Sequence, residues 1–152
     1  MNEHRGTVMA IDPGRAKCGV AVVARPAGSA GPQVLHQEVV GAGDIGRVAE
    51  ELASRFRPDV VLVGGGTASR AVVELAESLR SAPVRVVDER LTTLQARLRY
   101  FRHNPPRGLR RLIPLSLQTP ERPYDDYVAV ILAERYLAAN RIQQQESAPK
   151  KE

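Results

Sequence analysis

Short apolar runs that alternate with helical repeats constrain the fold of this chain more than any other feature of its sequence. The first two runs, residues 7–11 and 18–24, are rich in β-branched and small apolar residues and are joined by a short turn, which predicts a β-hairpin. Residues 33–40 could supply a third strand. Three consecutive strands of this kind can pair antiparallel.

The middle of the chain changes to a strand-and-helix alternation. Apolar residues recur at helical spacing over residues 44–57 and again over residues 68–80. Residues 59–63 and 84–87 are instead short, continuous apolar runs, as in buried strands. Because strands connected through helices pair in parallel, the sequence predicts an α/β fold with a mixed five-stranded sheet flanked by helices.

The last third of the chain contains two helical patterns separated by a proline-rich segment. A short helix capped by Thr92 or Thr93 is expected to end near residue 101, and a final helix is expected over residues 124–140. Residues 103–123 contain five prolines and one glycine and are predicted to form a long loop. Loops of this length in a small domain are usually functional.

Length and composition indicate one domain. The 152 residues, 43% of them hydrophobic, can build one core, so we expect a domain over residues 1–141 and a disordered polar tail over residues 142–152. Cys18 is the only cysteine, which excludes an internal disulfide or a zinc site made of several cysteines. The start of the chain does not read as a secretory leader, and no stretch approaches the roughly 20 apolar residues of a membrane span. A cytoplasmic protein with no membrane partner is therefore expected.

The charge of the chain favours a polyanionic partner. The formal net charge is +5, and most of the basic residues are arginines. Residues 97–111 contain six arginines and no acidic residue, so this segment could contact phosphates, although a solvated helix face would have the same composition. Tyr100 or Phe101 could stack on an unpaired base or could belong to the core. The predicted nucleic-acid contacts are Lys17, Arg90, Arg97, Arg99, Arg102, Arg107, Arg110 and Arg111.

Three acidic residues lie where predicted elements begin or end. Asp12 follows the first strand, Glu89 follows the fifth, and Asp125 opens the last helix. Side chains at such positions can meet at one edge of an α/β sheet. Each acid also has an ordinary interpretation as a turn residue, a surface ion-pair partner or a helix cap, and Asp88 and Asp126 could replace their neighbours.

Carboxylates without histidine or cysteine partners are typical of Mg²⁺ or Mn²⁺ sites. Three such groups held together repel one another unless a cation lies between them. In a site with two ions, one ion activates water and the other stabilises the leaving oxygen of an in-line displacement. Phosphodiester hydrolysis is the natural reaction for this set of residues, and two ions are expected.

A run of three glycines, Gly64, Gly65 and Gly66, precedes the second helix. Backbone N–H groups in a turn at a helix start can bind phosphate. The run is equally consistent with a tight turn that has no ligand. It is not a Walker loop, because no Gly-Lys-Ser/Thr sequence follows it.

Four segments in order make the sequence recognisable: IDPGRAKCGVAVV, VVLVGGG, VRVVDERLTTLQA and DDYVAVILAERYL. Together they resemble the YqgF/RuvX family of Holliday junction resolvases and pre-16S rRNA processing nucleases. The resemblance covers residues 8–137, and DERLTT is its most specific part. It implies a ribonuclease-H-like fold and a metal-dependent endonuclease.

The resemblance also assigns roles to individual residues. It implies that Asp12, Glu89 and Asp125 are catalytic metal ligands. Asp125 is preferred because the family's helix ends in Tyr-Leu eleven and twelve residues after its aspartate, as here, and Asp126 remains an alternative. Lys17 stands where the family usually has arginine, which keeps the charge but loses the bidentate fork.

Several substrates and functions remain open at this point. A four-way DNA junction needs two symmetric cuts and would predict a homodimer, whereas the end of a precursor rRNA can be processed by a monomer. A nucleotide-dependent kinase or ATPase with the same core fold would normally need two copies of it, and this chain provides one. After the nuclease and the kinase or ATPase, the third class of function is a non-catalytic RNA-binding or ribosome-assembly protein.

Overall fold

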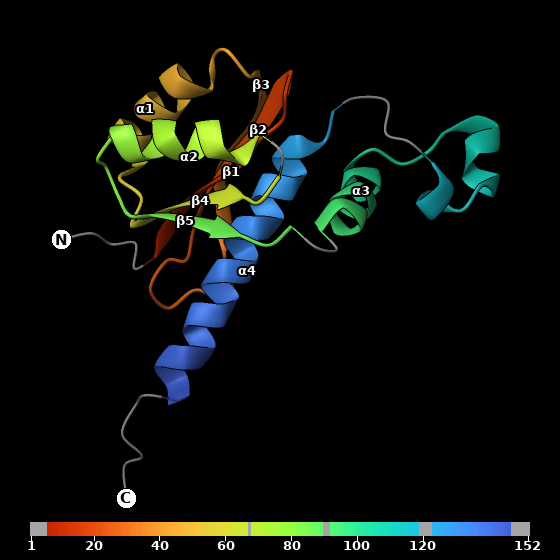
Figure 1. The fold of residues 1–152 in the computed structure, drawn as a ribbon. Helices are drawn as coiled ribbons and strands as arrows, with labels where there is room; N and C mark the ends of the chain where they lie inside the picture. The colour runs from red at the N-terminus through yellow and green to blue at the C-terminus, as the bar shows by residue number, and fades with distance from the viewer. Residues whose placement is uncertain (1–5, 67, 90–91, 119–122, 147–152) are drawn as a thin grey trace, which may run out of the picture.

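The computed structural model describes residues 6–66, 68–89, 92–118 and 123–146. Five strands form one sheet in the order β3-β2-β1-β4-β5 (Figure 1). β1 pairs antiparallel with β2 and β2 with β3, whereas β4 pairs parallel with both β1 and β5. The predicted mixed five-stranded α/β sheet is confirmed. The strands are β1 (Thr7–Asp12), β2 (Lys17–Ala24), β3 (Gln33–Gly41), β4 (Val60–Gly64) and β5 (Val84–Val87).

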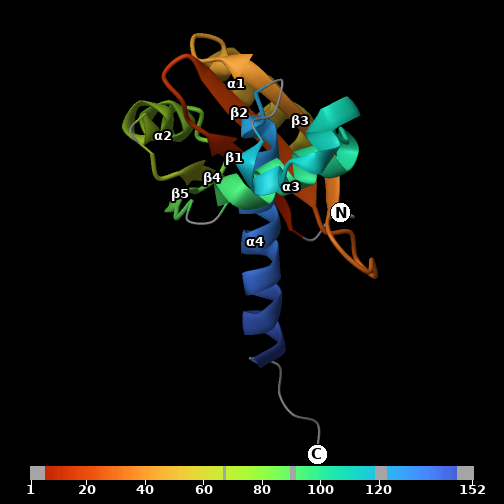
Figure 2. The same cartoon turned by 90° about the vertical axis from the view of Figure 1, so that its right-hand side faces the viewer.

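Helices cover both faces of this sheet, as predicted. α1 (Ile45–Phe56) and α2 (Ser69–Ser78) lie on one face, and the long α4 (Asp125–Glu146) crosses the other (Figures 1 and 2). α3 (Thr92–His103) packs beside α4. None of the helices among the described residues is both long enough and apolar enough to cross a bilayer.

Alternation along the strands decides which residues face α4. Val8 and Ala10 of β1 belong to the core cluster that α3 and α4 cover. Because successive side chains of a strand point to opposite faces, Asp12 falls on the same face. The same period places Gly19 of β2 and Gly64 of β4 on this face, in line with their core neighbours.

The structure corrects two sequence predictions in the C-terminal third. α4 continues to Glu146, so residues 142–146 of the predicted disordered tail are helical, whereas residues 147–152 lie outside the described residues. Ala, Arg and Gln are good helix formers, and a helix already nucleated by packing extends cheaply into solvent. The predicted loop 103–123 is also partly ordered into two 3₁₀ helices, η1 (Gly108–Leu112) and η2 (Leu115–Leu117). The part of this segment that carries η1 and η2 projects beside α3, away from the sheet (Figure 1).

Candidate active site

Asp12 ends the central strand with a glycine on each neighbouring strand. It pairs in register with Gly19 of β2. On the other side, Ile11 pairs with Val63 of β4, and the residue after Val63 is Gly64. Asp12 therefore lies between two positions that have no side chain on the α4 face of the sheet.

The space above each glycine is filled by another part of the site. A Cβ on Gly19 would overlap the backbone carbonyl of Asp125 and lie 2.6 Å from the amide nitrogen of Asp126. A Cβ on Gly64 would overlap the Glu89 carboxylate and lie 2.7 Å from its Cδ. The two glycines thus allow the start of α4 and the Glu89 side chain to approach Asp12 from opposite sides. This role of Gly19 and Gly64 was not predicted from the sequence, although glycine inside an apolar strand is a known sign of close approach.

Glu89 follows β5 by two residues and is held through its backbone. Its carbonyl oxygen accepts a hydrogen bond from the Thr92 amide at 3.0 Å and another from the Thr92 hydroxyl. Thr92 is fully buried at the start of α3. Within the described part of the chain, the buried Oε1 of Glu89 has no hydrogen-bond partner.

The three predicted carboxylates influence one another. Burial, the hydrogen bond of protonated Asp12 to Glu89, and the charges of Glu89 and Asp125 raise the pKa of Asp12 to about 8. Burial also raises the pKa of the Cys18 thiol, and Asp12 and Asp125 add to this effect. Cys18 is buried in the sheet, as predicted, with its thiol directed at the carbonyl of Gly14. The acids therefore form one electrostatic unit at the edge of the sheet.

Asp125 and Asp126 have different surroundings. Asp126 is 3% exposed, and its Oδ2 accepts a hydrogen bond of 3.0 Å from Gln37 Nε2 on β3. Asp125 acts on Asp12 through both charge and hydrogen bonding. Asp126 is thus hydrogen-bonded to the edge strand β3, whereas Asp125 interacts with Asp12.

The donor set suits a hard divalent cation, but it is not a closed cage. No group of three or more His, Cys, Asp or Glu residues among those described is arranged to hold a metal ion. The acids nevertheless provide only oxygen donors, which Mg²⁺ and Mn²⁺ prefer. The unsatisfied, buried Oε1 of Glu89 and the raised pKa of Asp12 are both features that a bound cation would relieve.

The glycine run after β4 has the structure of a turn. The Gly65 amide donates to the Val87 carbonyl at 2.9 Å, and the Gly66 amide donates to the Gly64 carbonyl at 3.0 Å. Gly64 itself belongs to β4. Because these two amides already have acceptors, the turn interpretation accounts for these glycines.

The predicted basic contacts do not form one uniform surface. Arg99 of α3 donates to Glu134 of α4 at 2.7 Å, so its charge is paired within the fold. Arg97 and Arg110 are partly exposed, and Arg90 lies outside the described residues. Tyr100 and Phe101 are each 5% exposed and belong to the core. The exposed members of the predicted set are Lys17, Arg102, Arg107 and Arg111.

A known protein that is similar in sequence to this chain is named as a nuclease. A protein of Thermobifida fusca (strain YX) named "Putative pre-16S rRNA nuclease" is 36% identical over 107 residues, which are 61% of this chain and 64% of the relative. The match spans slightly less than two thirds of the relative's length. This relative confirms the resemblance to the YqgF/RuvX family. No family model matches the chain.

Two proteins whose solved structures have a similar architecture are recorded in complex with Holliday junction DNA. RuvC of Thermus thermophilus superposes with a TM-score of 0.61 at 23% identity, covering 90% of this chain and 96% of that one. The fowlpox virus resolvase, in complex with Holliday junction DNA, gives a TM-score of 0.58 at 14% identity and covers 87% and 99%. The chain has the ribonuclease-H-like fold. In this ribonuclease-H-like sheet, Asp12 and Glu89 lie where the central strand and β5 end, as the sequence predicted.

Proposed function

We propose that the chain is a divalent-metal-dependent endonuclease that hydrolyses phosphodiester bonds in structured nucleic acid, with Asp12, Glu89 and Asp125 as its catalytic carboxylates. The observation that carries this proposal is the convergence of Glu89 and Asp125 on Asp12, whose pKa is raised to about 8 by burial and by these two neighbours. An acidic cluster of this kind is costly for a fold that does not use it. A cation that binds between the acids would offset that cost.

The chain's own residues define what the site could do. Asp12 lies at the centre, Glu89 brings a buried oxygen without a partner, and Asp125 stands at the N-terminus of α4. These three would hold Mg²⁺ or Mn²⁺. Two such ions, when bound, supply an activated water and a counter-charge for the leaving oxygen.

Exposed basic residues support a nucleic-acid substrate. Carboxylates repel phosphates, so substrate affinity must come from basic residues nearby. Lys17 is exposed at the start of β2, five residues after Asp12, and Arg102 is exposed on α3. Together with Arg107 and Arg111, they would hold a backbone across the site.

Two kinds of substrate fit this reading. The T. fusca relative is named for pre-16S rRNA, which favours a precursor rRNA end. The resolvases with a similar fold favour a four-way DNA junction, which would require a homodimer to make paired cuts. We rank the precursor rRNA first, because the T. fusca protein named for it is 36% identical to this chain, whereas the two resolvase-like structures are 23% and 14% identical.

The test compares labelled four-way DNA junctions and precursor rRNA 5′ fragments with Mn²⁺ or EDTA, using the wild type and Asp12→Asn. Metal-dependent cutting of the RNA that is lost in the variant supports rRNA processing. Paired, metal-dependent cuts in the junction support a resolvase. If neither substrate is cut, or if Asp12→Asn cuts as fast as the wild type, the nuclease proposal is wrong and a binding protein is the better description.

A further inference from the structure

The segment that follows α3 contains two adjoining hollows. One has a volume of about 590 Å³ and is lined by Pro105, Pro106, Arg107, Arg111, Ile113 and Leu115. The other, of about 290 Å³, shares both prolines and Arg107 with the first and extends to the end of α3. We call residues 104–118 the arm. Hollows of this size are in the range that holds a ligand as large as a nucleotide.

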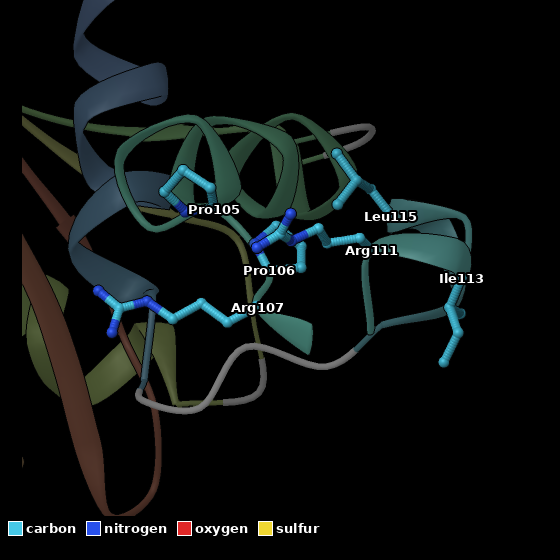
Figure 3. A pocket seen from close by; sticks show the side chains of 6 residues that line it. All are labelled: Pro105, Pro106, Arg107, Arg111, Ile113 and Leu115. Atoms are coloured by element: carbon cyan, nitrogen blue, oxygen red, sulfur yellow. The ribbon is translucent and has the colours of Figure 1, made fainter. Parts of the chain in front are cut away.

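The lining of the larger hollow combines flat apolar surface with guanidinium groups. Figure 3 shows Arg111 reaching back toward Pro106, with Leu115 and Ile113 on the outer side and Arg107 extending away from Arg111. Ile113 is 46% exposed, so its side chain is available to a ligand. Apolar and guanidinium surfaces are those on which an unstacked base packs, because every base has a flat π-face.

The charges of the arm complement a phosphate. No acidic residue occurs in the sequence between Glu89 and Glu121. Within the described part of the chain, neither Arg107 nor Arg111 takes part in an ion pair. Both guanidinium groups are therefore available to anions, whereas Arg99 on the preceding helix is not.

The arm is held in shape by a buried side chain. Gln118 is 4% exposed, and its Nε2 donates to the carbonyls of Arg110 at 2.7 Å and Ile113 at 2.8 Å. These two bonds close the turn that carries Arg111 and Ile113. A hollow fixed in this way binds without a large ordering cost.

The arm follows a helix that begins next to the candidate active site. It follows α3, whose first residue, Thr92, is bonded to the Glu89 carbonyl. The 12 residues of α3 span about 18 Å. The hydrogen bonds of Thr92 thus tie the helix that carries the arm to the backbone of Glu89.

From these observations we infer that the larger hollow of the arm receives one unpaired nucleotide, with its base against Pro106, Ile113 and Leu115 and its own phosphate at Arg111, while Arg107, which extends away from Arg111, holds a neighbouring phosphate of the same strand. This inference rests on the proposed function, because the nucleotide belongs to the nucleic acid that the acidic site would cut. A base inside a duplex is paired and stacked and does not reach such a hollow. The arm thus selects substrates that contain an unpaired nucleotide, as loops, bulges and single-stranded ends do.

The test is a binding measurement in EDTA, where a metal-dependent nuclease does not cut. Fluorescence anisotropy gives the Kd for two end-labelled duplexes that differ only in one bulged nucleotide, each prepared as DNA and as RNA. We expect the wild type to bind the bulged duplex about 10-fold more tightly than the paired one. Ile113→Ser should reduce this ratio to about 1–3 without weakening binding to the paired duplex.

Two further variants separate the hollow from the general surface of the arm. Leu109→Ser alters a leucine that is 83% exposed but does not line the hollow, so it should keep the wild-type ratio. Arg111→Gln should weaken binding to both duplexes and lower their salt dependence. Equal binding of the two duplexes by the wild type, or an equal loss of preference in Leu109→Ser and Ile113→Ser, would overturn the inference. Because binding in EDTA does not require cleavage, a preference for the bulge without any nuclease activity would leave the inference standing and reject the nuclease.

Discussion

The carboxylate of Glu89 occupies the space that a methyl group on Gly64 would fill. Gly64 is the last residue of β4 and lies beside the end of β1, where Asp12 stands. An acid after an edge strand can reach the centre of the sheet only if the strand between them offers no side chain. The glycine is therefore part of the arrangement that brings Glu89 and Asp12 together.

We predict that Gly64→Ala lowers metal-dependent cleavage by about 100-fold or more, because the new Cβ must displace Glu89, and shifts of about 1 Å have effects of this size. Gly65→Ala is the matched control. Its Cβ would lie 3.4 Å from the Val87 carbonyl oxygen and 3.5 Å from Val86 Cγ1, which are ordinary contacts. Cleavage rates, with circular dichroism to verify folding, measure the difference. Equal activity in the two variants would contradict a role for Gly64.

Much of the fold could be predicted from the sequence because its two periodicities are clear. β1 and β2 are continuous apolar runs buried on both faces, and α1 carries its apolar residues at helical spacing. The strand order could not be predicted in the same way. Placing β4 beside β1 depends on contacts between residues about fifty positions apart, which no local pattern records.

The acidic residues of the candidate site could be predicted from the sequence, but the glycines that make room for them could not. The ends of β1 and β5 identified Asp12 and Glu89, whereas Gly19 and Gly64 become meaningful only when the sheet is assembled. The proline-rich arm was expected to be a loop. Its 3₁₀ turns depend on Gln118, whose two hydrogen bonds are not visible in a local sequence pattern.

Substitutions of the two adjacent aspartates of α4 should have different effects on stability and on cleavage. Asp126 is buried and accepts a hydrogen bond from Gln37 on β3, so Asp126→Ala should lower the free energy of unfolding by about 1–3 kcal/mol. Asp126→Asn keeps an acceptor for Gln37 and should recover part of that loss. Asp125→Asn should remove cleavage with little loss of stability. Urea unfolding and cleavage rates test these expectations, and a nuclease that survives Asp125→Asn but not Asp126→Asn would reverse the assignment.

Asp12 should make the metal-free protein less stable as the pH rises. Burial and the neighbouring acids raise its pKa to about 8 in the folded protein, against 3.8 for an ordinary aspartate. Between these two values the folded protein retains a proton that the unfolded chain has released. The free energy of unfolding therefore falls with increasing pH through this window and levels off above about pH 8.

In EDTA, we expect unfolding at about pH 8.5 to require about 1–3 kcal/mol less than at about pH 5 on account of Asp12, after allowance for solvent screening. Asp12→Asn should lack this component of the pH dependence. Asp44→Asn, at an acid whose side chain is 64% exposed, should retain it and serves as the control. Urea titrations at the two pH values measure the effect, and the same slope with pH in the wild type and Asp12→Asn would show that Asp12 is not the source.

Arg99 and Arg102 lie three residues apart on α3. We expect Arg99 to contribute to stability and Arg102 to contribute to nucleic-acid binding. Arg99 is bonded to Glu134 at 2.7 Å, and both side chains are about three-quarters buried, at 30% and 26% exposure. Arg99→Gln should therefore destabilise the protein by about 1 kcal/mol, since it loosens α3 from α4. It should leave the salt dependence of nucleic-acid binding unchanged.

Arg102 is exposed near the end of α3, where it can reach a phosphate. Arg102→Gln should leave stability within about 0.5 kcal/mol of the wild type and should reduce the slope of log K against log salt concentration by about 1. Affinities for one duplex at several salt concentrations, together with urea unfolding, separate the two variants. A reduced salt slope in Arg99→Gln would mean that its bond to Glu134 opens to admit the nucleic acid, and that α3 presents both arginines to the substrate.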